Sequence, residues 1–432
     1  MTLDAEVRAL ERVAKAKPDD GAAQVGLANA LVRMGRGDEA LEAFIRAASA
    51  EPGDPEVARG LAATDWWSGP RGTGGGARFV AVPGLRTRPN LVRAARLGQG
   101  GTGVALGRGL VFARATEEGG DARLVALALA TGRELWSREE RVAASAPPLV
   151  CEDAVVDAAL VDEAGSVVFR VRGRDAVTGS ERWGTTLELS GVRPGAIFSG
   201  AWVSGKNVAF AISPHGKTDF EPVVRVLDAT SGATRPDGGF SLPKLEDVAF
   251  EGDTLYAATR QEPRRIVART VDGVPVFKDA LSGHHTRRIV ATGDHLLVST
   301  DDSIVRLNRK TGEFMGSRIR RFTTSEALVV TPRLVIGSWQ REGTVALDLR
   351  TLERVWSDVP PSRVLQAAED TLYSVEGELL VRALDLATGE PLWSLDLGRL
   401  AVELDGGGVQ KVAVAPSRLV GLTREGVFFL LA

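Results

Sequence analysis

The chain has very few cysteines for its size: 432 residues include only one, Cys151. A single cysteine excludes an intrachain disulfide, a thiolate zinc cluster and a CxxC redox pair. Cys151 lies in the apolar run PPLVCED. We therefore interpret it as a small buried hydrophobe, with a reactive thiol as the less favoured alternative.

Long apolar runs are also missing. No stretch approaches the ~18 consecutive apolar residues of a membrane-spanning helix, and the N-terminal residues MTLDAEVRALERVAKAKPDD lack the apolar core of a signal peptide. We therefore expect no membrane span and a cytoplasmic location. The formal net charge of -3 argues against a nucleic-acid binder. Arginine far outnumbers lysine, which indicates GC-rich coding and a bacterial source.

Histidine is scarce too, which limits metal and acid–base chemistry. The pair His284 and His285 is expected in the loop before a strand, and His295 in the turn after it. A strand of this length spans about 17–20 Å, so the pair cannot share a metal ion with His295. The pair could combine with the Asp301-Asp302 turn in a metal site, but solvated loop residues are the favoured interpretation.

Motifs that carry catalysis are missing as well. The chain has no GxSxG elbow and no HExxH helix, and GTGGG (72–76) is not followed by Gly-Lys-Ser/Thr. The segment GQGGTG (98–103) matches GxGxxG but continues into a strand pattern instead of a helix, so we interpret it as a turn. The acidic residues are scattered over turns. We predict no catalytic residue, no cofactor and no metal.

The first 70 residues, in contrast, contain a helical repeat. Pro18 and Pro52 lie 34 residues apart, which is the period of the tetratricopeptide repeat. The residues expected to pack two helices together are Leu27, Ala28 and Leu31 in the first and Ala40, Phe44 and Ala47 in the second. Further helices are expected at 3–16 and 55–66. The block resembles one complete tetratricopeptide repeat with half a repeat on each side.

This resemblance implies a surface for peptides. In the family, the concave face of the first helix binds peptides, which here would offer Asn29 and Arg33. One repeat makes a very short groove, so a packing or docking module is the favoured alternative. We place the helical domain at 1–70 and a glycine-rich linker at 71–76.

The remainder repeats one motif. ALALATGRELW (126–136), TVALDLRTLERVW (344–356) and ALDLATGEPLW (383–393) each combine an apolar run, a turn and a tryptophan. Similar turns recur at spacings of about 40 residues, the length of one propeller blade. Two short apolar strands precede each copy, and we count eight such sets. We predict a mainly β fold, an eight-bladed β-propeller over residues 77–432.

The eighth set lacks an outer strand, because the sequence ends at GVFFLLA (426–432). An open edge would leave backbone groups unpaired. The segment ARFVAVPG (77–84) has no partner of its own, and we predict that it pairs with the last blade and closes the ring.

Aromatic side chains follow most of the turns. We expect them to lie between neighbouring blades and to be structural; they are Trp136, Trp183, Phe277, Trp356 and Trp393. Two middle repeats lack an aromatic at this offset: one has Pro236 there, and the other reads TGEFMGS. We expect the first, second, sixth and seventh blades to be joined more firmly than the middle ones.

The AlDxxTGxxxW pattern resembles the PQQ-like repeat of eight-bladed propellers, over about 350 residues. One branch of that family contains quinoprotein dehydrogenases, which bind pyrroloquinoline quinone and calcium and often carry a disulfide between adjacent cysteines. Another branch resembles the lipoprotein that helps assemble outer-membrane barrels. That lipoprotein is a non-catalytic scaffold. The chain cannot form the disulfide, shows no recognisable counterpart of the calcium and base residues, and lacks a signal peptide with a lipidated cysteine. Neither role transfers directly.

Charge is distributed unevenly. Residues 260–321 contain thirteen basic and seven acidic residues, whereas the first 70 contain eight basic and twelve acidic ones. This asymmetry indicates docking guided by charge, or else ordinary solvated strand edges.

We predict a non-enzymatic scaffold that binds a protein partner through its helices and a loop-rich propeller face; the alternative is a small-ligand sensor, or a PQQ- or metal-dependent enzyme, using the central funnel. The expected contact residues on the loop-rich face are Glu117, His215, Lys217, Phe220, His284, Trp339 and Arg341.

Overall fold

The computed structural model of the protein describes residues 3–34, 36–50, 84–107, 109–117, 120–129, 131–151, 154–163, 166–189, 192, 195–214, 221–235, 240–241, 245–259, 265–280, 286–300, 303–319, 325–339, 343–362, 364–400, 408–415 and 418–432. Within these ranges, no helix is long and apolar enough to cross a membrane.

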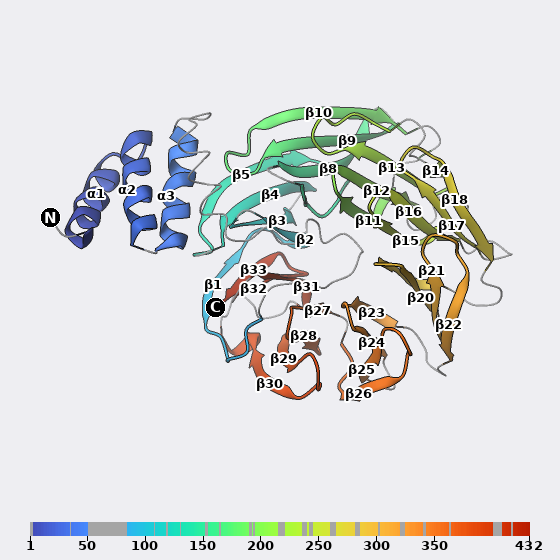
Figure 1. The fold of residues 1–432 in the computed structure, drawn as a ribbon. Helices are drawn as coiled ribbons and strands as arrows, with labels where there is room; N and C mark the ends of the chain where they lie inside the picture. The colour runs from blue at the N-terminus through green and yellow to red at the C-terminus, as the bar shows by residue number, and fades with distance from the viewer. Residues whose placement is uncertain are drawn as a thin grey trace.

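Three helices form an arm beside the ring: α1 (Leu3–Ala16), α2 (Gly21–Arg33) and α3 (Gly37–Ala50). Asp20 caps α2 by accepting a hydrogen bond from the Ala23 N–H at 3.0 Å. The residues predicted to pack α2 against α3 are all buried. The helices lie side by side, with α3 nearest the ring (Figure 1). Residues 51–83 lie outside the described ranges, so the predicted helix at 55–66, the domain end at 70 and the linker stay predictions.

Eight antiparallel sheets form the ring, each a blade whose strands are named here from the axis outwards. Blades 1 to 4 are β2 (Gly100–Gly107), β3 (Leu110–Thr116), β4 (Asp121–Ala128), β5 (Glu134–Arg141); β6 (Ala144–Ser145) with β7 (Leu149–Cys151), β8 (Ala154–Glu163), β9 (Ser166–Asp175), β10 (Glu181–Glu188); β11 (Ile197–Ser204), β12 (Asn207–Ser213), β13 (Val223–Asp228), β14 (Phe240–Ser241); and β15 (Leu245–Glu251), β16 (Thr254–Thr259), β17 (Arg265–Thr270), β18 (Pro275–Ala280). Blades 5 to 8 are β19 (Thr286–Thr292), β20 (His295–Thr300), β21 (Ser303–Asn308), β22 (Phe314–Ile319); β23 (Ser325–Val330), β24 (Leu334–Trp339), β25 (Gly343–Asp348), β26 (Arg354–Val359); β27 (Leu365–Ala367), β28 (Thr371–Glu376), β29 (Leu380–Asp385), β30 (Pro391–Asp396); and β31 (Val409–Ala415), β32 (Arg418–Thr423), β33 (Val427–Leu431), β1 (Leu91–Arg96). A 3-10 turn, η1 (Leu397–Arg399), follows blade 7. The prediction of an eight-bladed propeller is confirmed.

The ring is closed by β1, which pairs antiparallel with β33, as the blue and red strands show in Figure 1. The Asn90 N–H donates to the Ala432 carbonyl at 2.8 Å and extends this pairing. An upstream segment therefore supplies the missing strand, but it is residues 91–96 and not the predicted 77–84. One edge of β33 pairs with β32 and the other with β1, so β33 has no free edge for a further strand.

The apolar pattern of a segment does not show which backbone edge it will pair with. ARFVAVPG is the more apolar stretch, whereas β1 has the sequence LVRAAR. An outermost strand needs only backbone partners on one side and tolerates arginines facing solvent. Of the predicted segment, Gly84 alone is described, and its N–H donates to an oxygen of Asp370 in blade 7 at 3.0 Å.

The strands alternate in direction, so the connections sort onto two faces. The turn face carries the turns from first to second and from third to fourth strands. The loop face carries the connections from second to third strands and from one blade to the next. The apolar cores lie between successive blades, for example around Phe169 and Phe210 in blades 2 and 3. This arrangement leaves the two faces and the outer edges of the ring for contacts with other molecules.

Candidate interaction site: blade seams and a pocket on the helical arm

The repeated turn is held by its first acidic residue. In blade 2, an oxygen of Asp175 accepts hydrogen bonds from the N–H groups of Val177 and Thr178 at 3.0 and 2.9 Å. The Gly179 N–H then donates to the Asp175 carbonyl at 2.9 Å, with a positive φ of 68° at the glycine. The same bonds recur around Asp228 and Asp385.

We call the boundary between two neighbouring blades a seam. After blades 1, 2 and 6, the tryptophan of the motif contacts the turn of the next blade. The Trp136 indole N–H donates to the Ala176 carbonyl at 3.1 Å, and a Cβ on Gly179 would lie 2.6 Å from its ring. The glycine therefore makes room for the ring of the preceding blade. The other indole bonds are Trp183 to Ala229 at 3.1 Å, Trp356 to Leu386 at 3.0 Å and Trp393 to Leu85 at 2.7 Å.

The seams without a tryptophan are joined by other groups. Phe277 of blade 4 covers Gly312 of blade 5, without an N–H to donate. Between blades 5 and 6, Arg306 donates to the Leu349 carbonyl at 2.8 Å. Leu349 lies three residues before the turn residue Leu352, and Ala176 lies three residues before the turn glycine Gly179. The two carbonyls are therefore equivalent, and Arg306 bonds the one that the Trp136 indole bonds in blade 2. Between blades 8 and 1, the Arg93 side chain covers Gly132.

Two buried ionic groups lie between blades and were missed from the sequence. Arg114 of β3 and Arg174 of β9 both pair with Asp157 of β8, and all three side chains are less than a tenth exposed. Burial lowers the pKa of Arg114 to about 10, partly offset by the negative charge of Glu140. In the sequence, the only sign of this cluster is the charged residues that lie among the apolar residues of these strands.

The second group joins the innermost strands of blades 4 and 5. Asp247 of β15 accepts a hydrogen bond from the Ile289 N–H of β19 at 2.7 Å, and Arg288 lies 3.4 Å away. Burial raises the pKa of the Asp247 carboxyl to about 6, although Arg288 and the amide bonds oppose the shift. The neighbouring Glu246 accepts from the Thr286 N–H at 2.9 Å. These carboxylates therefore bond two blades at the axis.

The predicted contact residues do not form one cluster. Asn29 and Arg33 are exposed on α2, and Arg33 pairs with Glu6 of α1. Glu117 lies in the β3–β4 connection on the loop face. Trp339 is the last residue of β24, next to a connection of the loop face, but it is only 3% exposed, because its ring folds back over Gly337. The others fall outside the described ranges: His215, Lys217, Phe220, His284 and Arg341.

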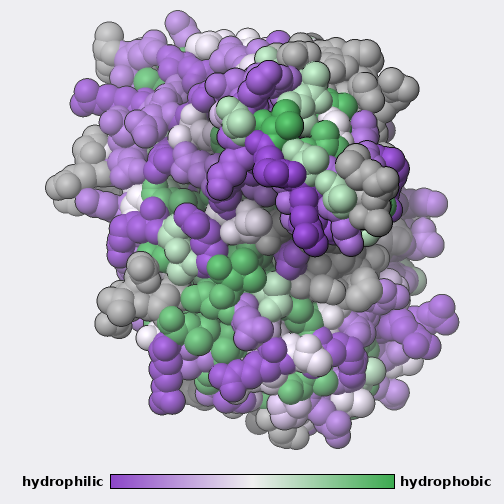
Figure 2. Space-filling model, turned by 90° about the vertical axis from the view of Figure 1, so that its left-hand side faces the viewer, coloured by the Kyte–Doolittle hydropathy of each residue, from purple (hydrophilic) through white to green (hydrophobic). Residues whose placement is uncertain are grey.

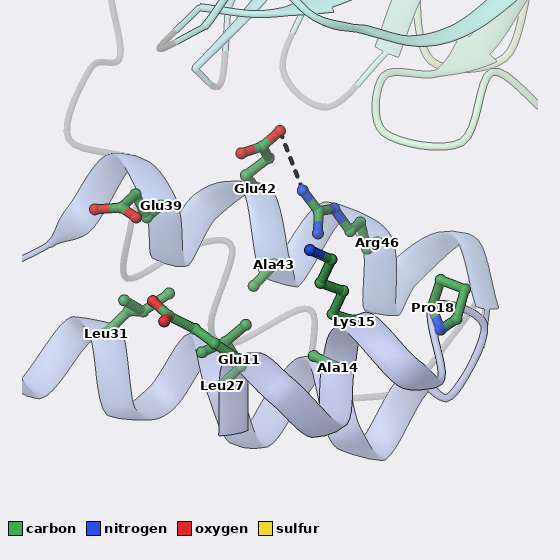
Figure 3. Close-up of a pocket in the computed structure, with 10 residues that line it drawn as sticks. All are labelled: Glu11, Ala14, Lys15, Pro18, Leu27, Leu31, Glu39, Glu42, Ala43 and Arg46. Atoms are coloured by element: carbon green, nitrogen blue, oxygen red, sulfur yellow. Dashed lines mark ion pairs between the residues drawn. The ribbon is translucent and has the colours of Figure 1, made fainter. Parts of the chain in front are cut away.

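A pocket of about 430 Å³ lies on the helical arm (Figure 3). Its floor and walls are Glu11, Ala14, Lys15, Pro18, Leu27, Leu31, Glu39, Glu42, Ala43 and Arg46. Leu27 and Leu31 lie two residues before Asn29 and Arg33, which is about 200° around a helix. The pocket therefore opens on the face of α2 opposite the predicted peptide-binding residues.

The α3 wall of the pocket is fixed to the ring. Glu42 pairs with Arg46 at 3.4 Å and with Arg133, at the β4–β5 turn of blade 1, at 2.8 Å. Buried arm residues and Trp136 belong to one apolar cluster, against which Leu135 packs. The ion pair and the shared apolar cluster thus join the arm to the first blade.

The side of the molecule that carries the arm shows hydrophilic groups with smaller apolar areas between them (Figure 2).

The metal-binding capacity of the described residues is limited. They contain no group of three His, Cys, Asp or Glu side chains close enough to hold a metal ion. Cys151 is buried, and its thiol lies 3.1 Å from the Gly205 carbonyl.

Two family models match separate parts of the chain. Residues 4–64 match the tetratricopeptide repeat, and residues 73–217 match a model described as outer membrane protein assembly factor BamB. No curated protein is significantly similar to the chain.

Three solved structures show the shared fold. BamB from Moraxella catarrhalis is 17% identical, with a TM-score of 0.54, and the match covers 80% of this chain and 98% of that one. The computationally designed Ika8 protein is 14% identical (TM-score 0.58; 78% and 96% covered). Quinohemoprotein alcohol dehydrogenase from Comamonas testosteroni is 11% identical (TM-score 0.53; 80% and 77% covered).

The likeness to these structures establishes the fold and leaves both a scaffold and an enzyme open. The arm, the eight blades and the repeated turns agree with the two family models. The chain therefore combines a tetratricopeptide-repeat arm with an eight-bladed β-propeller of PQQ-like repeats.

Proposed function

We propose that this protein is a non-enzymatic scaffold that binds protein partners in the cytoplasm. The observation that carries the proposal is a pocketed arm fixed to a closed ring. Arg133 and Glu42 tie the arm to blade 1, and the pocket lies on the same arm. An arm that packs on a ring, with two separate surfaces, suits a protein that holds partners side by side. The likeness to BamB, named an assembly factor, supports this choice.

The second candidate is a small-ligand sensor or a quinone-dependent enzyme. Its support is the fold shared with a quinohemoprotein alcohol dehydrogenase, together with Asp247, a buried carboxyl on an innermost strand with its pKa raised to about 6 by burial. Asp247 is already bonded to the Ile289 N–H and paired with Arg288. The described residues supply no metal-ligand group, so they do not fit a metal-assisted quinone site.

Affinity capture distinguishes the two candidates. The full chain, tagged at its C-terminus, is crosslinked in its native cells, purified and identified together with its partners by mass spectrometry. A scaffold should retain one or more proteins above a tagged unrelated propeller used as control. Absence of any such protein would overturn the scaffold, and a copurified quinone or marked thermal stabilisation by PQQ and calcium would then favour the second candidate.

A further inference from the structure

The charges around the arm pocket are segregated along the helices. Glu11 and Glu39 stand at one end, and Lys15 and Arg46 at the other (Figure 3). Glu11 and Lys15 are one helical turn apart, which is about 6 Å along α1. The pocket therefore offers a ligand an acidic end and a basic end.

The carboxylates of the acidic end are already bonded within the arm, because both share one arginine. Arg36 pairs with Glu11 at 3.3 Å, and its Nε donates to Glu39 at 2.6 Å. The hydrogen bond to Glu39 is the main cause that raises the pKa of Arg36, although burial opposes it. A cation from a ligand would have to displace this arginine, so the acidic end is a poor binding group.

The basic end has positive charge that is not fully paired within the arm. Glu42 is the only acidic side chain lining the pocket near this end, and it is shared between Arg46 and Arg133. Lys15 has no ion-pair partner among the described residues and is exposed. The Nε of Arg46 is buried and makes no hydrogen bond within the described arm. Two cations therefore face one shared carboxylate, which favours an anionic ligand group.

Between the two ends, the pocket surface is apolar. Ala14, Leu27, Leu31 and Ala43 line it, and all four are buried. A volume of about 430 Å³ lies within the range of pockets that enclose a small ligand or a large side chain. Burial of one large apolar side chain contributes about 1.5–3 kcal/mol, so the floor can anchor a peptide that the lysine orients.

We propose that this pocket binds a partner segment in which a large apolar side chain stands beside an acidic residue, with the apolar group on Leu27 and Leu31 and the carboxylate at Lys15. This inference rests on the scaffold function and specifies the chemistry of one partner. It places binding on the opposite face of α2 from Asn29 and Arg33.

Phage-displayed random heptapeptides selected on the immobilised full chain test the proposal. Enriched peptides should combine Asp or Glu with Leu, Phe or Trp, and synthetic copies should bind in fluorescence polarisation. Lys15→Glu should weaken these copies at least tenfold, and a second selection on this variant should enrich Lys or Arg instead. Arg12→Glu makes the same charge change on α1 outside the pocket and should leave binding unchanged.

Circular dichroism and thermal unfolding check that both variants keep the fold. No enriched motif, basic peptides on the wild type, or equal loss in Lys15→Glu and Arg12→Glu would overturn the proposal. If captured native partners bind the wild type and Lys15→Glu equally, the pocket proposal fails while the scaffold function stands. If no protein is captured at all, the scaffold function itself fails.

Discussion

The seams that follow blades 1, 2, 6 and 7 differ from those in the middle of the ring. In the first group an indole donates to a backbone carbonyl, and after blades 1, 2 and 6 it also covers the glycine of the next turn. In the second, the ring of Phe277 covers a turn without donating, and Arg306 donates without an aromatic ring. Asn207 of blade 3 donates to Asp253 of blade 4 at 3.1 Å.

The difference shows what a seam requires: a side chain that covers the turn of the next blade and a donor for a backbone carbonyl. The tryptophans of blades 1, 2 and 6 satisfy two needs at once: each fills the space over a glycine, and each bonds a carbonyl. Where the tryptophan is missing, different residues meet these needs separately. At the seam between blades 4 and 5, bonding moves to the axis, where Asp247 holds the Ile289 amide. The sequence motif therefore reports one solution to a requirement that other side chains also meet.

The largest effect is expected at a tryptophan seam. Trp356→Ala removes a buried ring and the bond to the Leu386 carbonyl, and should lower the free energy of unfolding by about 3–5 kcal/mol. Trp356→Phe keeps most of the ring but loses the donor, and should cost about 1–2 kcal/mol. Urea unfolding followed by intrinsic fluorescence and circular dichroism measures both. Equal losses in the two variants would show that the hydrogen bond, not the ring, holds this seam.

The stability contributed by Asp247 should fall as pH rises, because burial favours its neutral carboxyl over the ionised one. The Asp247 pKa is about 6 in the folded chain and about 3.9 in unfolded peptides. Its contribution is therefore fully present below pH ~4 and is lost as pH rises through about 6, a difference of about 3 kcal/mol. The stability of the wild type relative to Asp247→Asn should fall by that order between pH 4 and pH 7.5. Parallel pH profiles for the two chains, in urea unfolding, would contradict this prediction.

The turn of blade 6 should tolerate glycine poorly, although glycine stands there in other blades. Leu352 has a positive φ of 58°, which costs about 1–2 kcal/mol for a leucine, but it is only 4% exposed. Loss of a buried leucine costs about 2–5 kcal/mol. Leu352→Gly should therefore lower the free energy of unfolding by about 1–3 kcal/mol.

The matched control is the reverse change in blade 7. A Cβ on Gly389 would lie 2.8 Å from the Trp356 ring, so Gly389→Leu should cost more than Leu352→Gly. Chemical denaturation of both variants decides the comparison. A stabilised Leu352→Gly would mean that backbone strain outweighs burial at this turn.

The smallest effect is expected where arginine replaces tryptophan. Arg306→Met keeps the alkyl chain and removes the donor to the Leu349 carbonyl, at a cost of about 1–2 kcal/mol. The exposed Arg354 on the next blade serves as control, and Arg354→Met should change the stability by less than about 0.5 kcal/mol. Thermal unfolding at matched ionic strength measures the difference. If the two variants lose equal stability, Arg306 does not replace the indole at this seam.

The pattern of the sequence predicted most of the ring but not its closure. Period-two alternation and the turn motif identified eight sets of strands, because each set must bury its own apolar faces. They did not identify LVRAAR as the closing strand, because an edge strand is selected by backbone pairing. The position of Trp339 next to a loop predicts exposure, but it does not show that the ring folds back over Gly337 and is buried.

The candidate site was the least predictable part. The resemblance to the repeat family points to Asn29 and Arg33 on its concave face, whereas the pocket lies on the other side of α2. Its basic end joins Lys15 and Arg46 from different helices, and its wall depends on Arg133 from blade 1, which is 91 positions beyond Glu42. Packing of the helices against one another brings Lys15 and Arg46 together, and packing of the arm on the ring adds Arg133.

By itself, the sequence determined the repeat: a helical arm, eight strand sets, and a glycine-containing turn followed by an aromatic residue in most of them. Local patterns suffice for this, because strand alternation and turn geometry act over a few residues. The tertiary structure alone decided which segment closes the ring, which arginine replaces an indole, and which charges line the pocket. These outcomes depend on contacts between segments far apart in the chain, where backbone edges, cavities and desolvated charges find their partners only after folding.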